Sequence, residues 1–357
     1  MLRQTDHLKE LQMNDAELQI LDYLYANPAC SSKEIHEGIQ IQIGYATVKR
    51  SLKRLDAQHY LKIEGKGRGT TYSLSPTYSI IRPVDINEYF QNEIDEREIQ
   101  EGFNLDLIST ILPTVELFTE EEMQTLESLQ KIYEQNIRSL TESQFQKELE
   151  RLAIDLSWKS SQIEGNTYSL LETERLLKEK ETAAGKHKDE ATMLLNHKDA
   201  LDFIIENPDY LDPIEVGNIE DIHSILIKDL GVERNIRKRR VGISGTNYRP
   251  LDNEFQIREA LKQTCELINI KKNVFEKSLL LLVLLSYIQA FNDGNKRTAR
   301  IVSNACLINN KYCPISFRTI DSIEYKKAIL LFYEQNNISV FKKIFINQFE
   351  FAVKTYF

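Results

Sequence analysis

The sequence predicts a mainly α-helical protein built from more than one domain. At 357 residues the chain exceeds the usual length of a single domain. Its hydrophobic content of 41% is enough for substantial cores, and apolar residues recur at helical spacing along much of the chain. Strand-like patterns are confined to two short regions. We therefore expect a helical bundle with one small β-hairpin, preceded by a smaller module of helices and two strands.

The N-terminal module begins with a predicted helix at residues 15–26, which Pro28 helps to terminate. Ser31 or Ser32 caps a short second helix, and Gly44 opens a third. Each of these helices carries leucine, isoleucine or valine side chains on an inner face.

Two strands, at residues 60–63 and 71–74, follow the third helix and flank a basic, glycine-rich turn at 65–69. Three helices and such a wing make a winged helix-turn-helix, which we assign to residues 1–78.

The outer face of the third helix and the wing are suited to DNA. In this fold the third helix enters the major groove and the wing reaches the phosphates. The predicted DNA-contacting residues are Thr47, Lys49, Arg50, Lys53, Arg54, Lys66 and Arg68. The alternative is a protein-docking module, because residues 1–80 are almost neutral overall.

Residues 79–140 are predicted to form a helical connector, with helices at 86–100, 105–112 and 120–137. Its acidic runs are typical of solvated helix faces. The net charge of the whole chain is −9, which argues against a protein that coats nucleic acid along its length.

A long helix is predicted to begin at a capping box formed by Thr141 and Gln144. Ser160 and Glu164 fall one turn apart near its end, and Gly165 is suited to stop it.

The strongest candidate site follows residues 279–288, which are apolar on nearly every face and predict a buried helix. A tight Asp-Gly-Asn turn at 293–295 then leads into a second helix at 296–309. A helix N-terminus binds anions through its free N–H groups. Arg297 and Arg300 would add charged donors for phosphate, and the aspartate of the turn would hold a metal ion. The alternative is an ordinary turn and helix cap.

Residues 239–248 alternate apolar side chains before a Ser-Gly-Thr-Asn turn, which predicts a β-hairpin. Helices are expected at 257–268, 325–334 and 340–349. Tyr325 and Tyr333 have helical spacing, which favours core packing over stacking on a ligand.

The segment from Gln289 to Arg300, Gln-Ala-Phe-Asn-Asp-Gly-Asn-Lys-Arg-Thr-Ala-Arg, resembles the signature loop of the Fic/Doc (Fido) family. The better-known members transfer AMP from ATP to a hydroxyl of a target protein. The resemblance covers roughly residues 81–357 and implies a Fido helical bundle at 141–357. It also implies ATP and Mg²⁺ as ligands and a hydroxyl-bearing protein as the partner.

Carried across position by position, the resemblance makes Asp293 the Mg²⁺ ligand. Arg297 would hold the inner phosphates and Arg300 the γ-phosphate. The nucleotide-binding set it implies is Asn292, Gly294, Asn295, Lys296, Arg297 and Arg300.

Three positions depart from the family pattern. Gln289 replaces the histidine that removes the proton of the attacking hydroxyl, and a side-chain amide cannot act as a base near neutral pH. Ala290 replaces a proline. Lys296 replaces a glycine and resembles the Doc variant that transfers phosphate, whereas Arg300 retains the AMP-transferring pattern. We therefore expect nucleotide binding in the AMP orientation, with weak or absent transfer.

A second motif, at residues 160–166, resembles the inhibitory helix of self-inhibited members of the family. It implies that the carboxylate of Glu164 pairs with Arg300 and occupies the γ-phosphate subsite. The inhibitory residues it implies are Ser160, Glu164, Gly165 and Asn166.

The resemblance also implies that the predicted hairpin is a flap that covers the site and pairs with an extended segment of the target. The flap residues are Val241, Gly242, Ile243, Ser244, Gly245 and Thr246. Asn336 or Asn337 would touch the adenine.

The remaining features are compatible with a cytoplasmic protein. The four cysteines and six histidines lack the spacing of a metal site. The opening Met1-Leu2-Arg3-Gln4 is not typical of a signal peptide. No apolar run is long enough to cross a membrane. A homodimer is left open. Two function classes remain: a self-inhibited protein adenylyltransferase of weak activity, and a non-catalytic regulator that binds ATP or DNA.

Overall fold

The computed structural model describes residues 13–100 and 102–357. The opening segment Met1-Leu2-Arg3-Gln4 lies outside the described residues. The chain divides into two compact units. One contains residues up to Val84 together with Thr114–Glu116, and the other contains Asp85–Pro113 and Leu117–Phe357.

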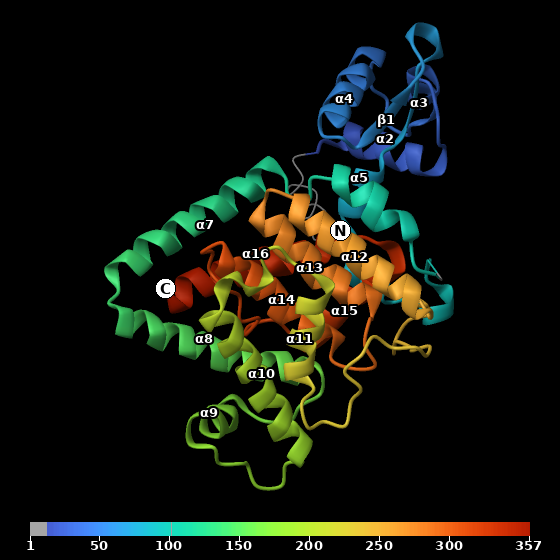
Figure 1. Cartoon of the computed structure of the whole chain (residues 1–357). Helices are drawn as coiled ribbons and strands as arrows, with labels where there is room; N and C mark the ends of the chain where they lie inside the picture. Colours follow the sequence, from blue (N-terminus) through green and yellow to red (C-terminus); the bar gives the residue numbers. More distant parts are fainter. Residues whose placement is uncertain (1–12, 101) are drawn as a thin grey trace. The chain divides into compact units, whose positions relative to one another are not determined.

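The N-terminal unit is a winged helix (Figure 1). Its helices are α2 (Asp15–Ala26), α3 (Ser32–Gly38) and α4 (Tyr45–Ala57), followed by strands β1 (Leu61–Glu64) and β2 (Thr71–Leu74) and helix α5 (Pro76–Ile81). The two strands are antiparallel, with Leu61 opposite Leu74 and Glu64 opposite Thr71. Ser31 is the residue that caps α3, through a reciprocal bond with Glu34. The predicted three helices and wing are confirmed.

The connector differs from its prediction. The expected helix at 86–100 is wrong, because only α6 (Ile86–Tyr89) and a 3₁₀ turn at Ile94–Glu96 form. The reason lies in tertiary contacts: the backbone N–H of Gln100 donates to the carbonyl of Glu334 at 2.8 Å. The buried guanidinium of Arg97 also pairs with the Glu334 carboxylate at 3.2 Å. These bonds hold the segment extended against the bundle and outweigh helix propensity.

The second predicted connector helix, at 105–112, is a short π-helix over Leu107–Ile111 followed by a 3₁₀ turn. The third is confirmed as α7 (Glu120–Ser139).

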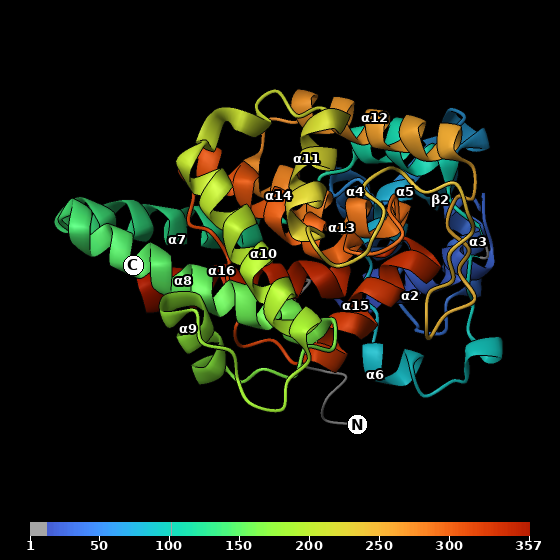
Figure 2. The ribbon, with the colours of Figure 1, turned by 60° about the horizontal axis from the view of Figure 1, so that its bottom comes forward.

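The C-terminal unit is a helical bundle (Figures 1 and 2). After α7 come α8 (Glu142–Ile163), α9 (Leu170–Glu179), α10 (Lys188–Glu206), α11 (Val216–Leu226), α12 (Glu254–Ile270), α13 (Val274–Ile288), α14 (Asn295–Asn309), α15 (Ser322–Gln335) and α16 (Ser339–Tyr356). Helix α13 is the centre of the core: every residue from Leu279 to Ile288 is buried, as its apolar sequence predicts. Helices α9 to α11 were not among the predicted elements.

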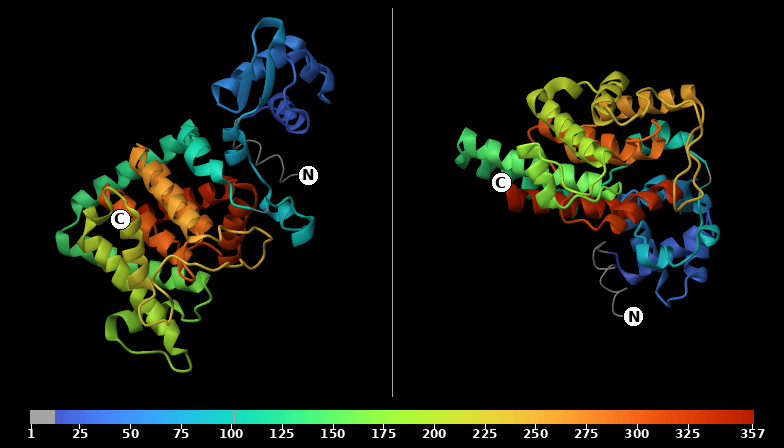
Figure 3. Two further views of the ribbon diagram at one scale, coloured as in Figure 1. Left: turned by 45° about the vertical axis from the view of Figure 1, so that its right-hand side comes forward. Right: turned by 90° about the horizontal axis from the view of Figure 1, so that it is seen from below.

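The predicted β-hairpin at 239–248 does not form. The long connection from α11 to α12 makes a turn at Ser244 and Gly245, but its arms carry no paired strand (Figure 3). A two-stranded ribbon this short is marginal on its own. The arms are held from outside instead: Arg97 donates to the Gly245 carbonyl at 2.7 Å, and Asn247 to Asp95 at 2.9 Å.

Within the described ranges, no helix combines the length and apolarity needed to cross a bilayer.

Candidate functional site

The loop between α13 and α14 is shaped by two left-handed residues. Gln289 ends α13 with φ 51°, and Gly294 precedes α14 with φ 81°. The backbone conformation of Gly294 favours glycine, and a Cβ there would make tight contacts, 3.3 Å from Ile227 and 3.4 Å from His223. No side chain caps the start of α14, which leaves N–H groups of its first turn available to an anion.

Two polar side chains brace this loop from within. The amide of Asn295 accepts from the backbone N–H of Phe291 and donates to its carbonyl, both at 2.8 Å. The ring of His223 stacks on Phe291 at 3.7 Å, and its Nε2 donates to the carbonyl of Asp293 at 2.9 Å. Burial lowers the pKa of His223, which keeps the imidazole neutral. The backbone of the loop is therefore preorganised.

Arg237 joins the loop to the connection between α11 and α12. Its guanidinium is buried and donates to three backbone carbonyls, those of Gln289 (2.5 Å), Arg239 (2.8 Å) and Leu251. Its own N–H donates to the carbonyl of Ala290 at 3.0 Å. One side chain thus connects the backbone at Gln289 to two points of the connection between α11 and α12.

Arg297 and Arg300 are almost completely buried on α14, with relative exposures of 1% and 0%. Arg297 pairs with the carboxylate of Asp293 at 2.9 Å. Arg300 lies over the ring of Tyr325 at 5.3 Å and donates to the Ser160 hydroxyl at 2.8 Å and carbonyl at 3.0 Å. Arg297 Nε and Arg300 Nη1 have no hydrogen-bond partner among the described residues. Each arginine thus has one buried N–H group without a partner in the described part of the chain.

The carboxylate of Glu164 is shared by two cations of α14. Its Oε1 lies 2.9 Å from Arg300 Nη2, and its Oε2 lies 3.3 Å from Lys296 Nζ. Burial alone would raise the pKa of Glu164, but the charges of Arg300 and Lys296 outweigh it and lower the pKa. Glu164 is therefore an ionised group held where the resemblance puts the γ-phosphate.

The end of α8 sets the position of Glu164. Glu164 is the C-cap, and Gly165 follows with φ 101°, a conformation that disfavours other residues. The amide of Asn166 then donates to the carbonyl of Glu190 on α10 at 2.9 Å.

The side chain of Gln289 is bonded within the loop and its surroundings. Its Nε2 donates to the carbonyl of Ser286 at 2.6 Å and to the hydroxyl of Tyr333 at 3.2 Å. Its Oε1 accepts from Asn295 at 3.2 Å. Tyr325 and Tyr333 are fully buried, as predicted. Tyr333 also contacts Gln289 of the loop, and Tyr325 contacts Arg300 on α14.

Other predicted residues take different places. Asn336 and Asn337 are buried and already bonded, Asn336 to Asn104 at 3.0 Å and Asn337 to Ser339. Asn292 donates to Glu233 at 3.0 Å, at the edge of the loop.

Three residues near the loop were not predicted from the sequence, namely His197, His223 and Arg237, and Tyr333 was predicted only as a core residue. His197, on α10, is fully buried, and neither of its ring nitrogens has a hydrogen-bond partner among the described residues. Burial and the nearby charges of Arg300 and Arg297 hold its pKa well below the ordinary value. No spacing rule separates such residues from ordinary core or surface residues, so only tertiary structure could identify them.

The residues of the loop are suited to hold a magnesium ion only when a bound nucleotide supplies further ligands. Among the described residues no group of three or more His, Cys, Asp or Glu could hold a metal. Mg²⁺ in nucleotide sites, however, needs one or two carboxylates and takes its other ligands from phosphates and water. The carboxylate of Asp293 is 61% exposed beside the loop and meets that requirement.

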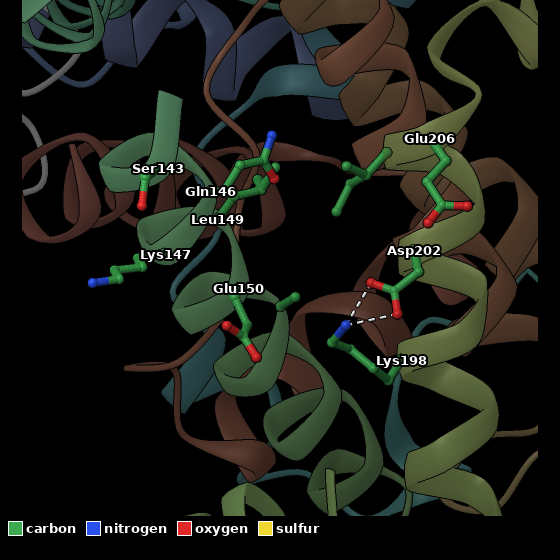
Figure 4. Close-up of a pocket in the computed structure, with 10 residues that line it drawn as sticks. Ser143, Gln146, Lys147, Leu149, Glu150, Lys198, Asp202 and Glu206 are labelled. Carbon is green, nitrogen blue, oxygen red and sulfur yellow. Dashed lines mark hydrogen bonds and ion pairs between the residues drawn. The ribbon is translucent and has the colours of Figure 1, made fainter. Parts of the chain in front are cut away.

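A surface cavity of about 410 Å³ lies between α8 and α10, away from the loop (Figure 4). Lys198 and Asp202 pair across one turn of α10 on its wall, and Gln146 and Glu150 face them from α8. None of the predicted site residues lines it.

In the winged helix, the third helix and the wing present exposed cations. Lys49, Arg50, Lys53, Lys66 and Arg68 are exposed, and Thr47 is half-buried. Arg54 is different, because its Nε lies 3.2 Å from the carboxylate of Glu17, a residue with 0% exposure. Its first role is therefore to neutralise a buried acid between α2 and α4.

Comparisons with known proteins agree with both units. Residues 213–307 match the sequence model of the Fic/DOC family. The chain carries a Fic/DOC domain. Residues 13–131 match the model of the penicillinase repressor. A search of curated protein sequences found no significant match.

Solved structures share the Fic fold at low sequence identity. C. elegans Fic-1 (residues 134–508) is 19% identical, with a TM-score of 0.58 over 66% of this chain and 72% of that one. A Fic-domain signalling protein of Bacteroides thetaiotaomicron is 18% identical, with a TM-score of 0.57 over 65% and 95%. A Fic family protein of Desulfovibrio desulfuricans is 19% identical, with a TM-score of 0.56 over 66% and 74%. At these identities the likeness concerns the fold alone.

Proposed function

We propose that the Fic domain is a self-inhibited nucleotide site that binds Mg-ATP in the AMP-transferring orientation and transfers AMP weakly or not at all. The observation that carries this proposal is the Glu164 carboxylate, which bonds to both Arg300 and Lys296. A carboxylate held by two cations at a helix N-terminus stands in for a phosphate oxygen.

ATP would replace Glu164 as the partner of these cations. Arg300 would turn its Nη2 donor to the γ-phosphate, and Lys296 and the first N–H groups of α14 would hold the inner phosphates together with Arg297. Asp293 would hold the Mg²⁺, which would neutralise phosphate charge when bound. While Glu164 remains in place it excludes the outer phosphate by volume and by like charge.

The transfer step is weakened by the chemistry of residue 289. An amide can orient a hydroxyl but cannot accept its proton, and general-base catalysis is worth about 10²–10⁴-fold in rate. Of the nearby histidines, His223 is stacked on Phe291 and bonded to the Asp293 carbonyl, so it is not free to act as a base.

A second candidate function is a non-catalytic regulator, and the bonding of Gln289 favours it. Both polar atoms of its amide are engaged, with Ser286, Tyr333 and Asn295. Such a residue reinforces the loop. The Fic domain would then sense ATP while the winged helix binds DNA through the exposed residues Lys49, Arg50, Lys53, Lys66 and Arg68.

Three proteins separate the two functions: the chain as it stands, Glu164→Gly, and Glu164→Gly with Gln289→His. Each is incubated with α-labelled ATP and Mg²⁺, and self-labelling is measured beside ATP affinity. Labelling of Glu164→Gly would favour the transferase and contradict the regulator. Labelling only of the double variant would indicate a site that lacks only its base. Absence of both labelling and ATP affinity in all three proteins would overturn the nucleotide proposal.

A further inference from the structure

The connection between α11 and α12 is strongly basic, although the chain as a whole has a net charge of −9. Between residues 232 and 251 six side chains are basic and one, Glu233, is acidic. Arg237 is buried, so it does not contribute to the surface charge. Arg234, Lys238, Arg239, Arg240 and Arg249 are exposed, and we call these five residues the basic loop.

The basic loop runs directly beside residue 289. Glu233 bonds to Asn292 at 3.0 Å, and Arg237 bonds to the carbonyls of Gln289 and Arg239 at 2.5 and 2.8 Å. Residues 238–240 are consecutive, so these three side chains leave one short stretch of backbone. The shared bonds of Arg237 fix that stretch relative to the position where a hydroxyl would be attacked.

The charges of the basic loop are only partly neutralised. Lys238 and Arg240 form exposed pairs with Glu254 at 3.5 Å and Asp252 at 2.6 Å. Arg234, Arg239 and Arg249 form no ion pair among the described residues. Exposed pairs of this kind are weak and exchange readily for other partners. The surface beside the loop therefore carries a net positive charge, although the protein as a whole is acidic.

The backbone that carries these charges is also held in place. The flap turn is fixed by the bond from Arg97 to Gly245, and Arg97 is itself anchored by Glu334. Tyr89 donates to the same carboxylate at 2.6 Å. A positive surface with a braced backbone loses little entropy when a partner binds.

We infer that the basic loop is a docking surface for an acidic polypeptide segment, which would flank the hydroxyl presented to the loop at residue 289. This inference rests on the proposed function, because it names the class of its target. Charge complementarity would steer the acidic segment to the flap and would disfavour basic ones. The phosphates of the nucleotide have their own cations, Lys296, Arg297 and Arg300, so the basic loop is not needed for them.

The test measures fluorescence anisotropy of a labelled glutamate-rich peptide with the full chain, at low and at high salt. The variant pair is Arg234→Glu with Arg239→Glu, which breaks no ion pair among the described residues. The matched control is Lys131→Glu with Arg138→Glu, two exposed cations on α7 with the same change of charge. We expect the peptide to bind the parent chain and the control equally. Binding to the loop variant should be about tenfold weaker at low salt, and that difference should shrink at high salt.

Equal binding to the two variants, or no binding of the peptide to the parent chain, would overturn the inference. A single-stranded oligonucleotide of equal charge is run in parallel. If it binds more tightly than the peptide and loses affinity in the loop variant, the surface recognises nucleic acid and the inference is wrong.

Mg-ATP affinity is measured in the same proteins. We expect it to be unchanged by Arg234→Glu with Arg239→Glu, which also checks that the variant is folded. If the parent chain does not bind Mg-ATP, the proposed function fails, whatever the peptide does. If Mg-ATP binds and the peptide does not, only the docking surface is rejected.

Discussion

The carboxylate of Glu164 and the guanidinium of Arg300 are 2.9 Å apart, although 136 positions separate them in the chain. Arg300 has no exposure to solvent, and removing the counter-charge of a buried ion pair is strongly destabilising. The contact therefore has two consequences that can be measured separately. It stabilises the fold, and it occupies a donor that an incoming anion would need.

The first prediction concerns Glu164→Gln, which removes the charge and keeps the shape. We expect Mg-ATP affinity to rise by roughly tenfold, because a charge-assisted bond contributes about 1.5–3 kcal/mol and part of it must be broken by the nucleotide. Without nucleotide the variant should unfold at a lower temperature, since Arg300 is left buried without its counter-charge. Mg-ATP should restore much of that stability. Titration calorimetry and thermal unfolding measure the two effects.

The control for this prediction is Glu174→Gln, which removes an exposed carboxylate paired with Lys178 on α9. It should change neither quantity appreciably. A Glu164→Gln protein with unchanged Mg-ATP affinity would contradict the inhibitory role of Glu164.

The second prediction concerns His197 and the response to acid. Its folded pKa is held well below 6.5, mainly by burial, whereas the unfolded chain takes up a proton near that value. Below pH 6.5 the unfolded state thus binds one more proton, and the free energy of unfolding falls as pH falls. His197→Leu should reduce this slope by about 1.4 kcal/mol per pH unit between pH 5 and 6.

Urea unfolding at several pH values measures the slope. His187→Gln is the control, because it removes a histidine that is exposed. At pH 7 the His197→Leu protein should be at least as stable as the parent, since it removes two buried nitrogens that have no partner among the described residues. An unchanged slope would mean that His197 is charged in the folded protein.

Much of the fold and the core of the candidate site could be predicted from local patterns. The apolar run of α13, the glycine of the turn and the capping box at Thr141 are all signals that lie within a few residues of the features they specify. The connector helix at 86–100 was predicted wrongly because Glu334, more than two hundred residues away, draws Arg97 and Gln100 out of helical geometry. The hairpin was predicted wrongly for the same reason: its turn is bonded to distant partners, and its own arms do not pair.

Arg237 is the clearest case of what sequence patterns cannot supply. It is followed directly by Lys238, Arg239 and Arg240. The sequence alone does not distinguish the buried guanidinium of Arg237 from these exposed charges. Only the positions of three carbonyls around its guanidinium do so.

The third prediction therefore compares Arg237→Lys with Arg240→Lys. A lysine ammonium group cannot donate to all three carbonyls as the planar guanidinium of arginine does. Arg237→Lys should therefore destabilise the protein by roughly 3 kcal/mol. It should also weaken Mg-ATP binding, because the loop loses this support. Arg240→Lys should be close to neutral, because Arg240 forms an exposed pair. Chemical unfolding and calorimetry measure both variants. Equal effects of the two substitutions would contradict the role of Arg237 in holding the loop through these hydrogen bonds.

The fourth prediction separates two arginines on α4 that differ only in their partners. Arg50 is exposed, and Arg54 pairs with the buried carboxylate of Glu17. Arg50→Ala together with Lys53→Ala should weaken DNA binding with little change in stability. It should also lower the slope of log affinity against log salt by about 0.9 for each phosphate that the protein no longer neutralises. Arg54→Ala should instead destabilise the N-terminal unit, because it leaves Glu17 buried without its cation.

Lys33→Ala on α3 is the matched control, since it removes an exposed cation whose partner is Glu37 one turn away. It should change DNA affinity less than the α4 pair does. Gel-shift titrations at several salt concentrations and thermal unfolding of the same proteins give both readouts. DNA affinity that survives Arg50→Ala with Lys53→Ala would rule out α4 as the recognition helix. Exposed cations on a winged helix bind the phosphates of duplex DNA most tightly at low salt. If the folded N-terminal unit gives no gel shift at low salt, a protein-docking role would be favoured.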